Sequence, residues 1–275
     1  MNSCLQKIIV LILTLSTVLF STSVMAAAVH DINKTSHNFK ATGTAIVNTA
    51  LDAEVIQVCV YCHTPHSASK AGPLWNKAGA NFAGGQTFML YTSSATLSSA
   101  TKASTLPAGS PSLLCLSCHD GKTAMNILHN SSYGVDISVS AVSNKSEYPA
   151  GSRVISVQSG APVNDAFLMP GPRWSAELND GDGGMTKDMR TGFNDSLTDD
   201  HPIGFSYTAA QGEKPTKLNS IATMDSAIRF FGPQKRMECS TCHNPHVDSS
   251  VDVNYKPFLA KSNANSELCL ACHNK

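Results

Sequence analysis

Eight of the nine cysteines fall into four copies of one pentapeptide, Cys-x-x-Cys-His, and this feature constrains the chain more than any other. The copies span residues 59–63, 115–119, 239–243 and 269–273, while the ninth cysteine, Cys4, lies near the amino terminus. In this pentapeptide the two thiols form thioether bonds with the vinyl groups of a haem, and the histidine becomes an axial ligand of the iron. The sequence therefore predicts four covalently bound haems c.

The residues that would hold these haems follow directly from the motifs. The predicted thioether cysteines are Cys59, Cys62, Cys115, Cys118, Cys239, Cys242, Cys269 and Cys272. The predicted proximal iron ligands are His63, His119, His243 and His273. Paired cysteines also bind zinc or form redox disulfides. Neither use requires a histidine directly after the second cysteine of every pair, so we favour haem.

The second axial position of each iron must be filled for a haem that only transfers electrons. Two of the remaining histidines, His66 and His246, follow a proximal histidine by three residues, with proline directly before them. So short a link, stiffened by proline, does not reach round a porphyrin to the opposite face of the same iron. We therefore expect His66 and His246 to bind the irons of neighbouring haems.

The other four histidines supply the remaining distal candidates. His37 and His201 each precede a haem motif and lie among polar, turn-forming residues. Four distal faces are filled if these two act together with His66 and His246. His30 and His129 are further candidates, and methionine is an alternative distal ligand.

The motifs also form an internal repeat. Each half of the chain contains a lone histidine, then Cys-x-x-Cys-His-x-Pro-His, then Cys-x-x-Cys-His. A duplicated two-haem module is the simplest explanation. We assign residues 27–130 to an N-terminal dihaem module, 131–198 to a connecting segment and 199–275 to a C-terminal dihaem module.

The first 26 residues have the pattern of a secretory signal peptide. Lys7 precedes an apolar run that continues to Phe20, and small residues ending at Ala26 form a plausible cleavage site. The apolar run is shorter than a membrane span requires, although an uncleaved anchor is the competing interpretation. We expect an exported protein, periplasmic or extracellular at the cell surface, without a stable membrane span after cleavage.

Composition indicates how such a chain folds and which partners it excludes. Aromatic residues make up only 7% of the sequence, so four apolar porphyrins would supply much of the buried surface. We expect mostly irregular chain wrapped around the haems, with short α-helices and a few short strands. Strands are predicted at 135–142 and 153–157, and a helix at 221–231. Twenty basic against twenty acidic residues argue against nucleic acid as a partner.

The haem motifs resemble those of multihaem cytochromes with the doubled CXXCH motif. The matching segments are CVYCHTPH at 59–66, GPLWN at 72–76, CLSCHDGKTA at 115–124, DDHPIGF at 199–205, CSTCHNPH at 239–246 and CLACHNK at 269–275. The resemblance implies that His63, His119, His243 and His273 are proximal ligands and that His37, His66, His201 and His246 are distal ligands. Residues 130–198 contribute little to it.

Three functions follow as hypotheses. The first is an electron carrier with four bis-histidine haems, serving a respiratory chain that ends at an external acceptor, with redox proteins or other multihaem cytochromes as partners. The second is a multihaem reductase with one open haem. The third is a homopolymer: some relatives in the family form extracellular filaments in which the next subunit donates a ligand, a role that would suit His30.

Overall fold

The computed structural model describes the haem-motif regions of both halves and most of the C-terminal half. The described residues are 29–35, 37–39, 57–69, 74–77, 88, 90–91, 95–119, 126–140, 148, 150–155, 197 and 200–275. The predicted signal peptide at 1–26 lies outside them, as does most of the connecting segment.

The described helices and strands are all short. The α-helices are α2 (Ser99–Lys102), α3 (Pro111–His119), α4 (Tyr207–Glu213), α5 (Cys239–Cys242) and α6 (Glu267–Cys272). The strands are β1 (Ile127–Leu128), β2 (Val135–Asp136), β3 (Arg153–Val154), β4 (Phe205–Ser206) and β5 (Arg236–Met237). Turns of 3-10 helix cover Ile32–Lys34, Val58–Tyr61, Ile137–Val139, Ile221–Thr223, Val253–Tyr255 and Ala264–Ser266. Helices this short are not stable alone in water, so tertiary packing must hold them.

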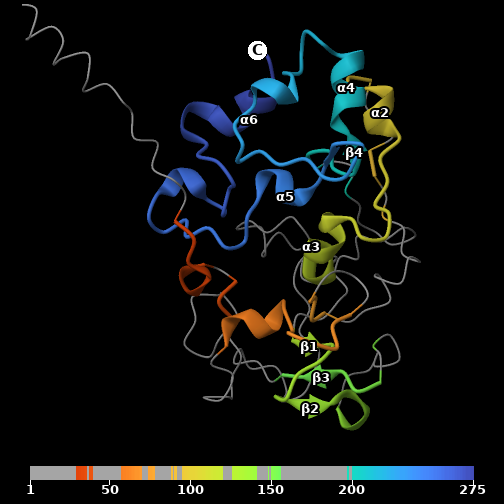
Figure 1. Cartoon of the computed structure of the whole chain (residues 1–275), viewed down its shortest axis with the longest axis vertical. Coiled ribbons are helices and arrows are strands. Elements are labelled where there is room, and N and C mark those ends of the chain that lie inside the picture. Colours follow the sequence, from red (N-terminus) through yellow and green to blue (C-terminus); the bar gives the residue numbers. More distant parts are fainter. Residues whose placement is uncertain are drawn as a thin grey trace, which may run out of the picture.

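Two small antiparallel sheets lie towards opposite ends of the molecule (Figure 1). One has the strand order β1-β3-β2, with Val154 of β3 paired to Ile127 on one side and Val135 on the other. The second pairs β4 with β5, placing Phe205 opposite Met237. Helices α3 and α5 lie between the two sheets, so two of the four haem motifs occupy the middle of the chain's fold (Figure 1).

Each sheet contributes to a hydrophobic core that includes haem-motif cysteines. Leu128 of β1 is fully buried in one hydrophobic cluster, and the partly buried Cys62 and Cys118 pack against this cluster. Phe205 and Met237 pack in a second cluster that includes Cys272. The cysteines thus lie at the edges of the apolar cores, where an attached porphyrin would extend the buried surface.

Three predicted elements differ from the structure. Strand β2 ends at Asp136, because the Asp136 side chain accepts a hydrogen bond from Ser138 N at 2.9 Å and starts a 3-10 turn. Strand β3 is likewise limited to two residues. The helix predicted at 221–231 is wrong: after the turn Ile221–Thr223, the Asp225 carboxylate accepts from Ala227 N at 2.9 Å. Such local side-chain bonding competes with the helix.

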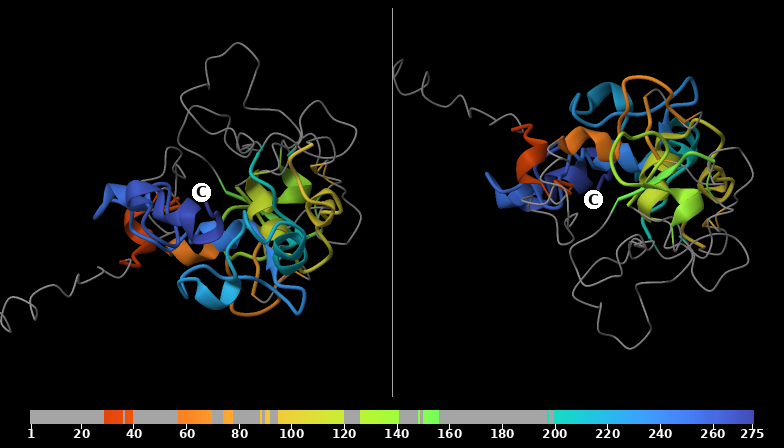
Figure 2. Two further views of the ribbon diagram at one scale, coloured as in Figure 1. Left: turned by 90° about the horizontal axis from the view of Figure 1, so that it is seen from above. Right: turned by 90° about the horizontal axis from the view of Figure 1, so that it is seen from below.

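The N-terminal segment packs against the C-terminal part of the chain. Asp248 N donates to Val29 O at 2.7 Å, and His30 forms an antiparallel bridge with Val247. The two further views show this segment beside the C-terminal residues (Figure 2). This contact brings the beginning of the described chain next to the second Cys-x-x-Cys-His-x-Pro-His motif.

Replacing Gly204 by alanine is expected to lower the free energy of unfolding by about 2 kcal/mol. Gly204 has φ of 74°, and a Cβ there would come within 2.6 Å of Thr105 O. The matched control is Gly212→Ala in α4, where a Cβ meets nothing within 4 Å. The midpoint of chemical denaturation tests the pair, and equal midpoints for the two variants would contradict the expectation.

Candidate functional site

Each Cys-x-x-Cys-His motif forms a helical turn that brings its first cysteine and its histidine together. The motifs lie on the 3-10 turn Val58–Tyr61 and on α3, α5 and α6. The backbone N–H of His63 donates to Cys59 O at 2.7 Å, and that of His243 donates to Cys239 O at 3.0 Å. One turn of helix spans the motif, so its thiols and imidazole can serve the same ligand.

Three of the four motif histidines face another histidine that lies far away in the sequence. The ring centroids of His63 and His246 are 6.5 Å apart, with an angle of 17° between the ring planes. The His119 and His37 rings are 6.2 Å apart. The His273 and His201 rings are also 6.2 Å apart.

These separations fit a haem iron between each pair of rings. A metal–imidazole bond of about 2.0 Å places two rings on opposite sides of one metal with their centroids about 6 Å apart. The three measured distances lie close to that value. With a haem bound, the two imidazoles of each pair would be its axial ligands and the porphyrin would supply the four equatorial nitrogens.

The pairs follow a rule that relates the two halves. In each half the leading histidine, His37 or His201, faces the histidine of the second Cys-x-x-Cys-His motif of that same half. His246 instead crosses between the halves and faces His63, not the nearby His243. The short Pro-His link therefore directs its imidazole to a different motif in this structure.

The structure does not bring the remaining histidines into such a pair. Among the described residues, His243 has its ring contact with Phe258, whose centroid lies 6.1 Å away, and no imidazole faces it. His66 is exposed, and its carbonyl accepts from Thr64 Oγ1 at 2.9 Å and from Asn130 Nδ2 at 3.0 Å. The predicted use of His66 as a fourth distal ligand thus has no matching contact within the described chain.

The two further candidates occupy different surroundings. His30 is exposed at the bridge to Val247. The backbone N–H of His129 donates to Asn76 O at 2.9 Å, while its Nδ1 is buried without a hydrogen-bond partner. Neither ring forms one of the facing pairs.

Backbone and amide oxygens orient three of the imidazoles. The Nδ1 atom of each ring lies 3.1 Å from an oxygen: that of His243 from Pro257 O, that of His246 from Asn244 Oδ1 and that of His201 from Pro202 O. Because these oxygens can only accept, they favour the tautomer with the proton on Nδ1. The lone pair of Nε2 is then free for a metal, the arrangement usual for ligating histidines.

Burial keeps the imidazoles of His37 and His119 neutral at neutral pH. Burial, with a smaller contribution from His119, lowers the pKa of His37 to about 4. Burial also lowers the pKa of His119, with nearby His243 as a second cause. A neutral ring is the form that coordinates a metal, so these sites are prepared for ligation at neutral pH.

Burial makes two of the motif cysteines, Cys62 and Cys242, poor nucleophiles. All eight motif cysteines are free thiols, and burial raises the pKa of Cys62 to about 12 and that of Cys242 to about 12. Among the described residues, no group of three or more histidine, cysteine or acidic side chains is arranged to hold a metal ion.

Thiols of successive motifs lie near one another. A hydrogen bond between Cys115 and Cys239 raises the pKa of Cys115 and lowers that of Cys239. Negative charge on Cys118 contributes to the raised pKa of Cys62, and negative charge on Cys272 contributes to the raised pKa of Cys242. The four motifs are therefore adjacent in space in the order of the sequence.

A shared backbone feature closes the two Cys-x-x-Cys-His-x-Pro-His motifs. In the first, Thr64 N donates to Leu74 O and Asn76 N donates to Cys62 O, both at 2.8 Å. In the second, Asn244 N donates to Phe258 O and Ala260 N donates to Cys242 O, again at 2.8 Å. Two segments that lie far apart in the sequence thus hold the two motifs in the same way.

The sequence reasoning missed this second closing segment. Leu74 and Phe258 both have positive φ, 58° and 42°, and both directly follow a proline. Aromatic side chains of the two segments also contact the motif histidines. The Trp75 ring lies edge-on to His63, with the centroids 5.6 Å apart, and the Phe258 ring centroid lies 6.1 Å from that of His243. Proline followed by two large apolar residues was the signal that could have identified it.

The chain matches no protein-family model, and no curated protein matches it. Within the described residues, no helix is long and apolar enough to cross a bilayer.

Proposed function

We propose that the chain is an exported tetrahaem c-type cytochrome that transfers electrons, acting in the periplasm or at the cell surface in a respiratory chain to an external acceptor. The observation that carries the proposal is the set of three facing imidazole pairs, each with one motif histidine and a spacing that fits one iron. Haem c bound at these sites supplies one-electron oxidation and reduction of iron.

The residues of this chain favour electron transfer over catalysis at three sites. His246, His37 and His201 occupy the faces opposite the proximal histidines, and a face that holds an imidazole does not admit a substrate. Aromatic side chains such as Trp75 pack against the proximal ring and restrict its rotation. Rigid ligands that stay in place in both redox states suit a carrier.

One observation favours a second candidate function. His243 has no facing imidazole among the described residues, and His66 is exposed. An open fourth site would suit a reductase. A fourth site completed by an exposed histidine of another copy would instead suit a homopolymer such as a filament.

Adding carbon monoxide to the reduced monomeric protein is expected to change the absorption of at most one haem in four. The three facing pairs fill both axial positions at their sites, while among the described residues no second imidazole faces His243, which leaves that site for an added ligand. A response from two or more haems would contradict the electron-carrier proposal. A response of one haem that disappears on self-association, followed by light scattering, would favour the homopolymer over the reductase.

A further inference from the structure

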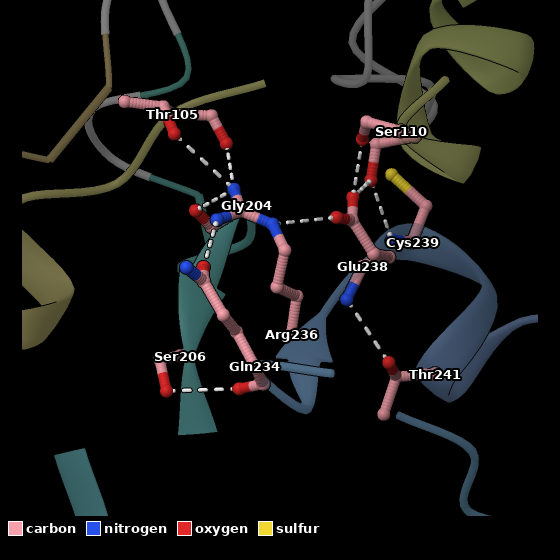
Figure 3. A network of polar contacts seen from close by, with 10 residues as sticks. Thr105, Ser110, Gly204, Ser206, Gln234, Arg236, Glu238, Cys239 and Thr241 are labelled. Carbon is pink, nitrogen blue, oxygen red and sulfur yellow. Dashed lines mark hydrogen bonds and ion pairs between the residues drawn. The ribbon is translucent and has the colours of Figure 1, made fainter. Parts of the chain in front are cut away.

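A buried carboxylate joins the two central haem motifs. Glu238 directly precedes α5 and is only 1% exposed. Its Oε2 accepts from Ser110 Oγ at 2.6 Å and from Ser112 Oγ at 2.5 Å, and both serines lie at the start of α3 (Figure 3). One carboxylate therefore holds the beginning of α3 against the beginning of α5.

Arg236 supplies the opposite charge. Its Nε donates to Glu238 Oε1 at 3.3 Å, and the side chain is 16% exposed. Its Nη2 donates to the carbonyl oxygens of Thr105 and Gly204 (Figure 3). Charges that are shielded from water act on their surroundings more strongly than surface charges, because the local dielectric is lower.

The pair lies beside two predicted thioether positions. Ser112 Oγ, which donates to Glu238, also accepts from Cys239 N at 2.9 Å. Cys239 begins α5, and its thiol lies close enough to Cys115 of α3 for the two groups to shift each other's pKa. Groups attached to these two cysteines would therefore lie next to the buried pair of Glu238 and Arg236.

We propose that Glu238 and Arg236 are positioning residues that set the reduction potentials of the haem sites on α3 and α5 and hold these two sites together. This inference rests on the proposed function. A nearby carboxylate stabilises the more positive, oxidised iron and lowers the potential, whereas a guanidinium raises it. Each residue of the pair therefore offsets the other.

The test uses two substitutions of opposite charge in the full-length holoprotein. Glu238→Gln is expected to shift at least one haem to a higher potential, and Arg236→Gln is expected to shift at least one haem to a lower potential. Spectroelectrochemical titration measures both. Loss of packing alone would move both variants in the same direction, since it admits water to the same junction.

Matched controls separate the charge pair from charge changes elsewhere. Glu213→Gln removes an exposed carboxylate that accepts from the backbone amides of Ser99 and Ala100, and Arg229→Gln removes an exposed guanidinium. Both controls should titrate as the wild type does. If Glu238→Gln does not accumulate, the comparison of Arg236→Gln with Arg229→Gln decides alone.

The outcomes distinguish this inference from the proposed function. Wild-type protein without haem, measured as pyridine haemochrome, would end the proposed function. Wild-type protein with four haems, combined with shifts of equal sign or no shift in the two variants, would overturn only the role of Glu238 and Arg236. Shifts of opposite sign support it.

Discussion

The double substitution of Cys115 and Cys118 by alanine is expected to lower the haem content from four per chain to three or fewer and to expose the chain to proteolysis. Both cysteines lie on α3, whose Leu113 and Leu116 are buried in the centre of the molecule. A nine-residue helix has little stability of its own, so losing the attached porphyrin should loosen its surroundings. Pyridine haemochrome per polypeptide and limited proteolysis measure the two effects.

The matched control is the same double substitution at Cys269 and Cys272. This motif lies on α6, which buries only Cys272, whereas α3 buries Leu113 and Leu116, so one haem should be lost with less effect on proteolysis. The intact mass of the wild-type mature protein tests the premise. A mass without added porphyrin, together with eight titratable thiols, would contradict haem attachment altogether.

Replacing His246 by alanine is expected to convert one haem from a six-coordinate, low-spin state to a five-coordinate, high-spin state. The His246 ring stacks opposite His63 at 6.5 Å, and no other imidazole among the described residues faces His63. Electron paramagnetic resonance of the oxidised protein measures the change, which should amount to about a quarter of the total haem signal. The haem count should remain four, because both thioethers at the His63 site are intact.

His66→Ala is the matched control, since His66 occupies the equivalent place in the other half of the repeat. Like His246 it is exposed, but among the described residues its ring faces none of the four motif histidines, so its removal should leave the spectrum of the monomer unchanged. An additional high-spin haem, relative to the wild-type monomer, in His66→Ala but not in His246→Ala would reverse the assignment. The two variants thus decide which half donates its Pro-His imidazole across the molecule.

The pairing of His63 with His246 links the two proposed dihaem modules at 27–130 and 199–275. The first half contains His63, but the imidazole facing it comes from His246 of the second half. The segment at Val29 and His30 is also bonded to the second half, beside Val247. The repeat is therefore visible in sequence and in local geometry, yet each half depends on the other to complete its contacts.

Some of the sequence-based predictions depend only on local chemistry. The cysteines and histidine of each motif could be grouped from the sequence because they lie within five consecutive residues, and a short helical turn brings those atoms together wherever the motif occurs. The prediction for residues 221–231 failed because the side chain of Asp225 offers the backbone a competing hydrogen bond, which apolar periodicity does not reveal.

The amino-acid sequence by itself determined which residues form the four Cys-x-x-Cys-His motifs and which other histidines are available, because each motif consists only of neighbours along the chain. Only the tertiary structure decided that His246 faces His63, that His37 faces His119 and that, among the described residues, no imidazole faces His243. It also decided that Glu238 is buried between α3 and α5. These contacts join residues up to about two hundred positions apart, and packing that closes such distances is a property of the whole chain.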